Sequence, residues 1–289
     1  MTIEQNKQAL RIDLHCHSNI SDGSLTPDVL VMRAAQMQLD YLAITDHDAI
    51  TAVELARAAA QAYGKGAPTI ISGVEFSCQW QGFEIHILGW NFDETHEAVV
   101  NLAQQQQATR RTRAEGIAEK LVKYGVATEH LPLVHTVRVL TRAHFAAALV
   151  SHGYVTSVQD AFRRYLGKGQ CAYVATPWCS IDDAIIAIQQ AGGNAGLAHP
   201  LAYQLTGKWL RRLVAAFKEA GGDAIEVASG QQEPKQRLQL AQLATEHELA
   251  ASVGSDFHFP GRWRELGKNL TLPPQCRPVW DTWNLKKGA

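Results

Sequence analysis

The chain has 289 residues, of which 46% are hydrophobic and 19% are charged, and its formal net charge is −1 at pH 7. This length is sufficient for one large, well-buried core. The near-neutral balance excludes a chain-wide cationic surface for nucleic acid but leaves local basic patches open. No apolar run of about 18 residues predicts a membrane span, and the N-terminus lacks a signal-peptide pattern.

Cysteine usage points to a reducing compartment. The five cysteines are odd in number, far apart and without a CxxC motif: Cys16, Cys78, Cys171, Cys179 and Cys276. This pattern is typical of free thiols rather than of a disulfide framework. We therefore expect a cytoplasmic protein.

The N-terminal part alternates apolar segments with helical patterns. Residues 11–17 ("RIDLHCH") and 41–48 predict strands, and residues 68–78 and 82–92 predict two more. The helix predicted over 26–38 begins at the N-cap Thr26, with Pro27 in its first position. A second helix over 50–64 ends at Gly64.

The same alternation resumes after residue 179. Helices are predicted over 180–193, 208–222 and 233–248, and strands over 194–200, 224–230 and 250–258. Repeated strand–helix units predict an α/β fold with a mostly parallel sheet, closed or nearly closed into a barrel. The active site of such a barrel lies at the C-terminal ends of its strands.

Residues 93–178 break this rhythm and predict a helical insert between barrel segments 1–92 and 179–289. One long helix is expected over 93–125, and two shorter ones over 141–153 and 157–167. Between residues 104 and 178 there are ten Lys and Arg against four Asp and Glu. The insert is therefore the basic part of an otherwise acidic chain.

Potential metal ligands gather near the ends of the predicted strands. Taken singly, His86 in an apolar strand is more typical of a core histidine, and His199 before Pro200 could be a turn residue. Glu75 is harder to explain, because an unpaired carboxylate in an apolar strand is costly. Barrel strand ends converge on one mouth, so we expect nine side chains to meet there: His15, His17, Asp22, His47, Glu75, His86, His199, Asp256 and His258.

Nitrogen and oxygen ligands without a thiolate suit manganese, iron or zinc. Nine side chains are too many for one ion and fit two or three ions that share a bridging carboxylate. Buried together without metal, they would leave most of their hydrogen-bonding capacity unmet. Such centres polarise phosphoryl oxygens and generate hydroxide from bound water. The residues thus predict hydrolysis of a phosphate ester by metal-bound hydroxide.

Seven motifs in this order resemble the PHP (polymerase and histidinol phosphatase) family: "DLHCHS", "SDG", "ITDHD", "GVEFS", "HILG", "LAHP" and "GSDFH". The segments "TRAHFAAALV", "FRRYLGKG", "YVATPWCS" and "IEVASG" resemble one subgroup. That subgroup comprises bacterial 3′,5′-nucleotide bisphosphate phosphatases and 5′→3′ exoribonucleases of the RNase AM type. The resemblance implies a distorted (β/α) barrel with three metal ions, usually Mn²⁺.

The resemblance also implies how the ligands divide. One ion would be held by His15, His17, Glu75 and Asp256, the second by Glu75, His86 and His199, and the third by Asp22, His47 and His258. Relatives in the subgroup commonly carry a phosphate-gripping Arg two residues after the "HP" motif, where this chain has Ala202. Either another cation substitutes for it, or phosphate binding is altered.

Candidate substrate-binding residues lie in the insert. The subgroup match favours Arg142 as a phosphate ligand, because an Arg fork matches phosphate oxygens. His144 follows two residues later and is otherwise a helix-packing histidine. Arg164 and Lys168, beside Tyr165, suit a short single strand.

A second cluster in the insert, Arg110, Arg111 and Arg113, is expected on a solvated helix face, with an RNA backbone as the alternative partner. Asp46 and Asp48 are the candidate general acids. Asp46 alternatively orients a ligand histidine, as acids behind a metal site do.

The function implied is a metal-dependent phosphoesterase that acts at nucleotide 5′ phosphates. It would release mononucleotides from 5′-phosphorylated single-stranded RNA, as in rRNA 5′-end trimming, and would convert 3′,5′-adenosine bisphosphate to AMP and phosphate. The alternatives are a small-metabolite phosphatase, such as a histidinol phosphatase, and a non-catalytic metal-binding accessory domain. No membrane association and no obligate protein partner are indicated.

Overall fold

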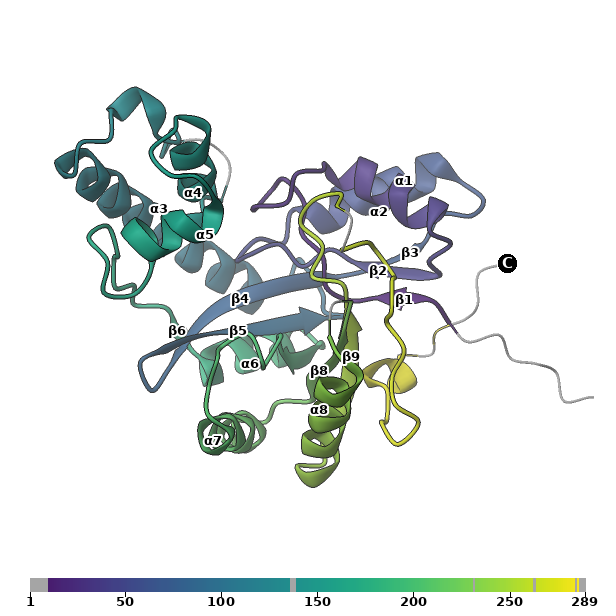
Figure 1. The fold of residues 1–289 in the computed structure, drawn as a ribbon. Helices are drawn as coiled ribbons and strands as arrows, with labels where there is room; N and C mark the ends of the chain where they lie inside the picture. Colours follow the sequence, from purple (N-terminus) through teal and green to yellow (C-terminus); the bar gives the residue numbers. More distant parts are fainter. Residues whose placement is uncertain (1–9, 136–138, 231, 262–263, 284, 286–289) are drawn as a thin grey trace, which may run out of the picture.

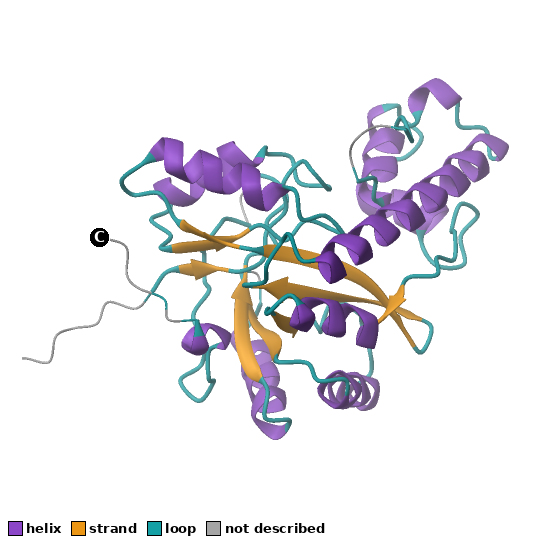
Figure 2. Ribbon diagram, turned by 180° about the vertical axis from the view of Figure 1, so that it is seen from behind, coloured by secondary structure: helices purple, strands orange, loops and turns teal. Residues whose placement is uncertain are grey.

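The computed structural model describes residues 10–135, 139–230, 232–261, 264–283 and 285, so the N-terminal stretch that lacks a signal-peptide pattern lies outside the described residues. Two sheets make up the body of the molecule, and helices cover their outer faces (Figures 1 and 2). Within the described ranges, no helix combines the length and the apolar character needed to cross a membrane. All five cysteines are described, and they are free thiols.

The first sheet is parallel and is built from the N-terminal strands β1 (Ile12–Asp13), β2 (Tyr41–Ala43) and β3 (Thr69–Ile71). Helices α1 (Pro27–Gln36) and α2 (Ala52–Tyr63) lie over one face of it (Figure 1). Both begin and end close to the predicted positions, and Gly64 closes α2 with a φ of +77°. The strands are shorter than predicted, because their polar ends leave the ladder to form loops.

The second sheet has the strand order β6-β4-β5-β7-β8-β9. Its strands are β4 (Gly73–Trp80), β5 (Phe83–Trp90), β6 (Cys179–Ser180), β7 (Asn194–Leu197), β8 (Ala224–Ser229) and β9 (Ala250–Gly254). Helices α6 (Ile181–Gln190), α7 (Gly207–Glu219) and α8 (Pro234–Glu246) pack against it through the largest buried apolar cluster. A short 3₁₀ turn, η3 (Val279–Thr282), packs near the C-terminus.

The two sheets meet along two seams and together form a distorted barrel. At one seam Leu14 N donates to Val253 O at 3.0 Å, and an isolated bridge pairs Cys16 with Phe257. At the other seam an isolated bridge pairs His47 with Glu75. Side chains from both sheets therefore face one another at the seams.

Strand β5 departs from the expected parallel arrangement, because it runs antiparallel to both β4 and β7. The cause is a two-residue turn in which Gln81 and Gly82 both have positive φ, 48° and 79°. Turns of this kind join antiparallel hairpins. The expectation that the ligands lie near strand ends is wrong for two of them. His86 lies within β5 opposite Ser77, and Glu75 lies within β4 opposite Leu88.

The insert contains α3 (Glu97–Lys123), the 3₁₀ turn η1 (Thr128–His130), α4 (Arg142–Ser151), α5 (Val158–Ala161) and the π-helical turn η2 (Phe162–Leu166). These helices enclose an apolar cluster of their own that includes Ile117, Phe145 and Leu149. The start of α3 packs instead into the core of the second sheet, through Val99 and Leu102. One continuous helix thus connects the insert to the barrel (Figure 1).

Trp90 at the end of β5 is fully buried and connects the two sheets, because its Nε1 donates to Leu14 O at 2.7 Å. Replacing Trp90 with Phe keeps a ring but leaves this buried carbonyl without its donor. We expect the free energy of unfolding to fall by about 1–3 kcal/mol, measured by urea denaturation. Trp283→Phe is the control, because half-buried Trp283 also loses an indole hydrogen bond, to Asn194, where water can replace it. Equal losses in both variants would contradict this role.

Candidate metal centre

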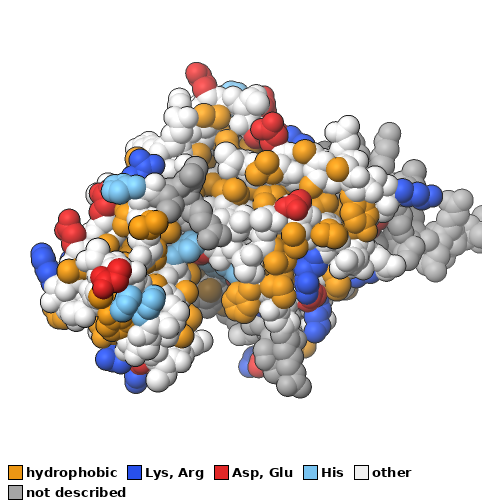
Figure 3. Space-filling view, turned by 90° about the horizontal axis from the view of Figure 1, so that it is seen from above, with side chains coloured by type: hydrophobic (Ala, Val, Ile, Leu, Met, Phe, Trp, Pro, Cys, Tyr) orange, Lys and Arg blue, Asp and Glu red, His pale blue; other side chains and the backbone are white. Residues whose placement is uncertain are grey.

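All nine predicted ligands come together in one cluster at the seams between the two sheets. They are delivered by the segments that follow β1, β2, β7 and β9 and by the strands β4 and β5 themselves. Viewed from above, histidine side chains reach the surface in a hollow beside the insert (Figure 3). Segments that are distant in the sequence thus supply one site.

The first ligands are positioned by strand alternation. Cys16 points into the core beneath α1, while His15 and His17 turn to the opposite side and are fully buried. Their Nε2 atoms lie 3.2 Å apart. The Oδ1 atom of Asp256 is 3.5 Å from each of these two nitrogens.

Glu75 occupies the centre of the cluster. Its Oε1 lies 2.9 Å from His86 Nδ1 and 2.9 Å from His199 Nε2. Its Oε2 lies 3.0 Å from His47 Nδ1 and 3.3 Å from His17 Nε2. Each oxygen therefore faces a different pair of imidazoles, which is the arrangement required of a bridging carboxylate.

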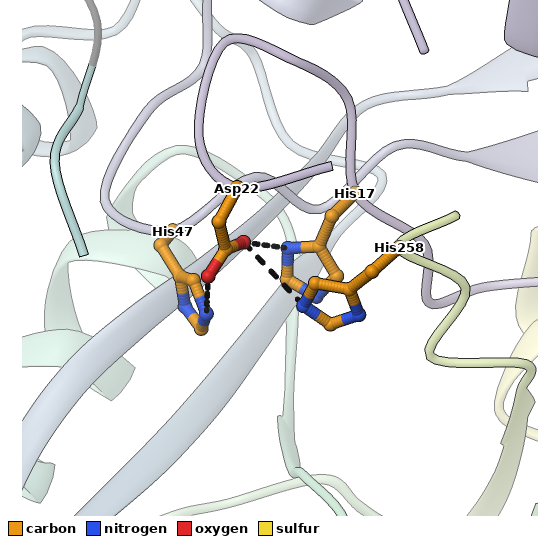
Figure 4. Close-up of side chains that lie close together, drawn as sticks. All are labelled: His17, Asp22, His47 and His258. Carbon is orange, nitrogen blue, oxygen red and sulfur yellow. Dashed lines mark ion pairs between the residues drawn. The ribbon is translucent and has the colours of Figure 1, made fainter. Parts of the chain in front are cut away.

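Asp22 lies among three histidines in the same way (Figure 4). Its Oδ1 is 3.4 Å from His258 Nε2 and 3.8 Å from His17 Nδ1, and its Oδ2 is 3.6 Å from His47 Nε2. The other ring nitrogen of His258 donates to Asp256 O at 3.0 Å, which directs Nε2 toward Asp22. These four side chains share one potential ion position.

The donor chemistry fits divalent cations. Four buried atoms of the cluster make no well-aligned hydrogen bond, although two of them, His47 Nδ1 and Glu75 Oε2, lie 3.0 Å apart. The other two are His17 Nδ1 and His199 Nδ1. Unsatisfied buried polar atoms are costly and are rare unless something binds them. Imidazole nitrogens and carboxylate oxygens are suitable ligands for manganese, iron or zinc.

Electrostatics within the cluster oppose a full set of protonated imidazoles. Burial, followed by the positive charge of His258, lowers the pKa of His17 to about 3. Burial also opposes protonation of His258, but Asp256 and Asp22 outweigh it and raise the pKa of His258 to about 9. Without another cation, the carboxylates retain a proton on some of these rings, and a metal ion would take the place of that charge.

Comparison with known proteins agrees with this geometry. The model of the PHP domain family matches residues 13–229, most of the chain. The chain belongs to the PHP domain family. A protein of Escherichia coli (strain K12) named 5′-3′ exoribonuclease Rnm is 47% identical over 277 residues, which is 95% of this chain and 94% of that protein.

Two further PHP relatives come from Chromobacterium violaceum. One is named 3′,5′-nucleoside bisphosphate phosphatase and is 39% identical over 273 residues, 93% of this chain and 95% of its own. The other is a solved structure described as an amidohydrolase with bound sulfate and no metal, with a TM-score of 0.86 and 38% identity. It covers 93% of this chain and 94% of its own. The predicted family and fold are thus confirmed.

The two carboxylates beside His47 in this PHP site, Asp46 and Asp48, are fully buried. Asp46 accepts hydrogen bonds from Ser18 and Ser21, which anchors the loop that carries Asp22. Their role as general acids stays a prediction, and their contacts favour positioning instead.

Asp48 connects the site to the insert. It accepts Ser77 N at 2.8 Å and Arg110 Nε at 2.5 Å, and Gln106 donates to it at 3.4 Å. Residues on α3 are therefore bonded directly to the segment that holds His47.

Beside the ligands, a cavity of about 140 Å³ has a wall formed by the insert. Arg142 lines it, and its guanidinium donates to Glu84 Oε2 at 2.5 Å. Arg113 also lines it and donates to Glu84 Oε1 at 2.8 Å. The expectation of a solvated face is wrong for Arg110 and Arg113, which are 4% and 7% exposed and contact the Trp178 ring.

The sequence spacing of these residues indicates that they share one side of a helix. Gln106, Arg110 and Arg113 are spaced i, i+4 and i+7, which places them on one face of α3. Arg113 Nε is buried without a hydrogen-bond partner. Burial, opposed by Glu84, lowers the pKa of Arg113 to about 10. The guanidinium stays charged at neutral pH and retains a free donor.

The remaining predicted substrate residues lie outside this wall. His144 contributes to the capping box of its own helix by accepting Thr141 N at 3.1 Å. Arg164 is half-exposed beside Tyr165, and Lys168 donates to Gly82 O at 3.0 Å. Their roles stay predictions.

Asp256 is paired with Arg264, which the sequence motifs do not single out. Its Nη1 donates to Asp256 Oδ2 at 2.7 Å and to Asp256 O at 2.8 Å. Ala202 is exposed, and the two arginines that follow it on α7 contact other groups: Arg211 pairs with Glu246, and Arg212 lies over the Trp209 ring. Two acids are also absent from the predicted site residues: Glu84, which pairs with Arg113 and Arg142, and Glu226, which contacts His15.

The central position of Glu75 predicts a graded metal loss. Glu75→Gln removes the carboxylate that faces four imidazoles, so we expect most of the bound metal to be lost. Asp22→Asn affects one group of ligands only, and we expect one ion fewer per chain than in the wild type. Metal content after Mn²⁺ loading and desalting measures both. Equal metal content in the two variants would argue against a bridging Glu75.

Proposed function

We propose that this chain is a metal-dependent phosphoesterase that hydrolyses phosphate esters at the 5′ end of nucleotides. Its substrates would be 5′-phosphorylated single-stranded RNA, from which it releases mononucleotides, as in rRNA 5′-end trimming, and 3′,5′-nucleotide bisphosphates. The observation that carries the proposal is the ligand cluster beside a cavity wall that contains Arg113 and Arg142.

The relatives support both substrates. The proteins named for exoribonuclease and for bisphosphate phosphatase activity match 95% and 93% of this chain, so the matches extend through the insert as well as the barrel. The sulfate in the Chromobacterium violaceum structure is a tetrahedral oxyanion, like a phosphate.

The residues of the site would have distinct roles. The nine ligands would hold Mn²⁺, or iron or zinc, and such ions polarise phosphoryl oxygens and lower the pKa of water. Arg113 and Arg142 would bind the second phosphate, which is the 3′ phosphate of a bisphosphate or the next phosphodiester of an RNA. Glu84 pairs with both guanidiniums, and two positive charges against one negative charge leave an excess of positive charge.

We assign the insert, residues 93–178, to capping the substrate. Arg164 and Lys168 on its surface suit the backbone of a longer RNA. Arg264 is the cation we propose in place of the Arg that the subgroup has at position 202, because it lies against a ligand of the cluster. Five free thiols suit the cytoplasm, which we propose as the compartment.

The alternatives fit less well. A small-metabolite phosphatase such as a histidinol phosphatase needs no second phosphate site. The cavity wall that contains Arg113 and Arg142, the arginine wall, would provide one. A non-catalytic accessory domain does not need a complete ligand set beside a cavity. The wall therefore favours a substrate with two phosphates.

The direct test is hydrolysis by full-length protein loaded with Mn²⁺. We expect mononucleotide release from a 5′-phosphorylated RNA oligomer and phosphate release from 3′,5′-adenosine bisphosphate, because both have a 5′ phosphate and a second phosphate. The matched control is the same oligomer with a 5′ hydroxyl. Absence of turnover on both substrates, or preference for histidinol phosphate, would contradict the proposal.

The arginine wall makes a second prediction. Arg113→Ala and Arg142→Ala each remove charge-assisted hydrogen bonds worth about 1.5–3 kcal/mol, so we expect kcat/KM for the bisphosphate to fall roughly 10- to 100-fold. Steady-state kinetics with metal content held constant measures this. Arg211→Ala is the control, since Arg211 pairs with Glu246 on the surface. Wild-type kinetics in both wall variants would remove the wall from substrate binding.

A further inference from the structure

Glu226, the third residue of β8, lies behind two ligands without being placed as a ligand itself. Its side chain is fully buried. Oε1 lies 3.1 Å from His15 Nδ1, and Oε2 accepts the backbone N–H of His199 at 2.6 Å. Both oxygens are engaged, and Glu226 belongs to none of the potential ion-binding groups among the described residues.

The backbone is shaped to permit these contacts. Strand β9 lies between β8 and β1, so Glu226 must reach past it to touch His15. Gly254 makes this possible, because a Cβ there would lie 2.6 Å from Glu226 Oε1 and 2.2 Å from His15 Cβ. An irregularity in the β8–β9 pairing follows directly after Glu226, and bulges of this kind re-aim side chains next to functional sites.

The contact with His15 selects one form of its ring. An imidazole that donates from Nδ1 keeps the lone pair of Nε2 free for a metal. Nε2 of His15 faces the cluster, 3.5 Å from Asp256 Oδ1 and 3.6 Å from Glu75 Oε1. Glu226 thus holds both the tautomer and the orientation that a ligand requires.

The contact with His199 acts on the backbone. His199 has a φ of +25°, a conformation that residues other than glycine rarely adopt. Its N–H is held by Glu226, and its Nε2 lies 2.9 Å from Glu75 Oε1. Glu226 therefore stabilises a strained segment that places a second ligand.

We propose that Glu226 is a positioning residue that sets His15 and His199 together, so that one carboxylate orients ligands of two neighbouring ion positions. The inference rests on the proposed metal centre. A glutamine cannot replace it, because its single carbonyl oxygen can accept from one of the two donors while its NH₂ faces the other.

The test is a titration of metal-free full-length protein with Mn²⁺. Electron paramagnetic resonance measures the bound Mn²⁺, and circular dichroism checks that each variant is folded. We expect Glu226→Gln to weaken Mn²⁺ binding roughly 10- to 100-fold. Asp223→Asn is the matched control and should bind as the wild type does. Asp223 precedes β8 and, like Glu226, accepts a backbone N–H with its carboxylate, here that of Ala195 on β7. This contact lies away from the cluster.

Wild-type Mn²⁺ affinity in folded Glu226→Gln would overturn the inference. Failure of the wild type to bind Mn²⁺ would instead overturn the metal centre itself, so the two failures are distinguishable. A measurement on wild-type protein covers the case in which the variant does not fold. In the zinc-loaded protein, ¹⁵N NMR of the imidazoles should show His15 protonated at Nδ1, assigned against His15→Asn. An unprotonated Nδ1 would overturn the inference.

Discussion

A carboxylate buried among imidazoles is the constraint on which the rest of this structure depends. Glu75 is fully buried, and both of its oxygens face ring nitrogens rather than water. Burial opposes its ionisation, but His86, His47 and His15 hold the pKa of Glu75 well below its usual range. A carboxylate persists in this position only where ring nitrogens, protonated imidazoles or cations compensate for its lost hydration. The seams between the sheets bring the ring nitrogens to it.

The need to compensate the charge of Glu75 explains where the strands end. Segments that continue a ladder satisfy their backbone groups within the sheet, whereas the ends of β1 and β2 turn out of it and carry His17 and His47 to Glu75. Their new backbone conformation is held by neighbouring acids: Asp46 binds the loop after β1, and Asp48 binds β4. The strands are short because their polar ends leave the sheet and contribute side chains to the site.

Much of this was predictable from the sequence, because each ligand is chemically unusual where it stands. Polar residues that end apolar segments in a strand–helix alternation converge on one mouth, which is why all nine ligands were predicted together. The same argument, that burying an isolated carboxylate is costly, holds for Glu226 in "AIEVASG", which was not among the predicted site residues. What the sequence could not show was which side of a strand faces which neighbour. The antiparallel β5 and the reach of Glu226 past Gly254 depend on pairings between distant segments.

The insert shows the same limit of prediction from sequence, because its contacts with the barrel depend on distant segments. Its basic character was visible, but a count of charges cannot distinguish a solvated arginine from a buried one. Arg110 is buried because it pairs with Asp48, and the helical repeat places Arg113 on the same face of α3. One continuous helix, α3, thus sets the distance between His47 and the arginine wall. On the proposed function, a fixed distance is what a substrate with two phosphates separated by one nucleoside requires, and both an RNA 5′ end and a 3′,5′-bisphosphate have that spacing. The ion pair between Asp48 and Arg110 would therefore act on substrate choice, although neither residue needs to touch the scissile phosphate.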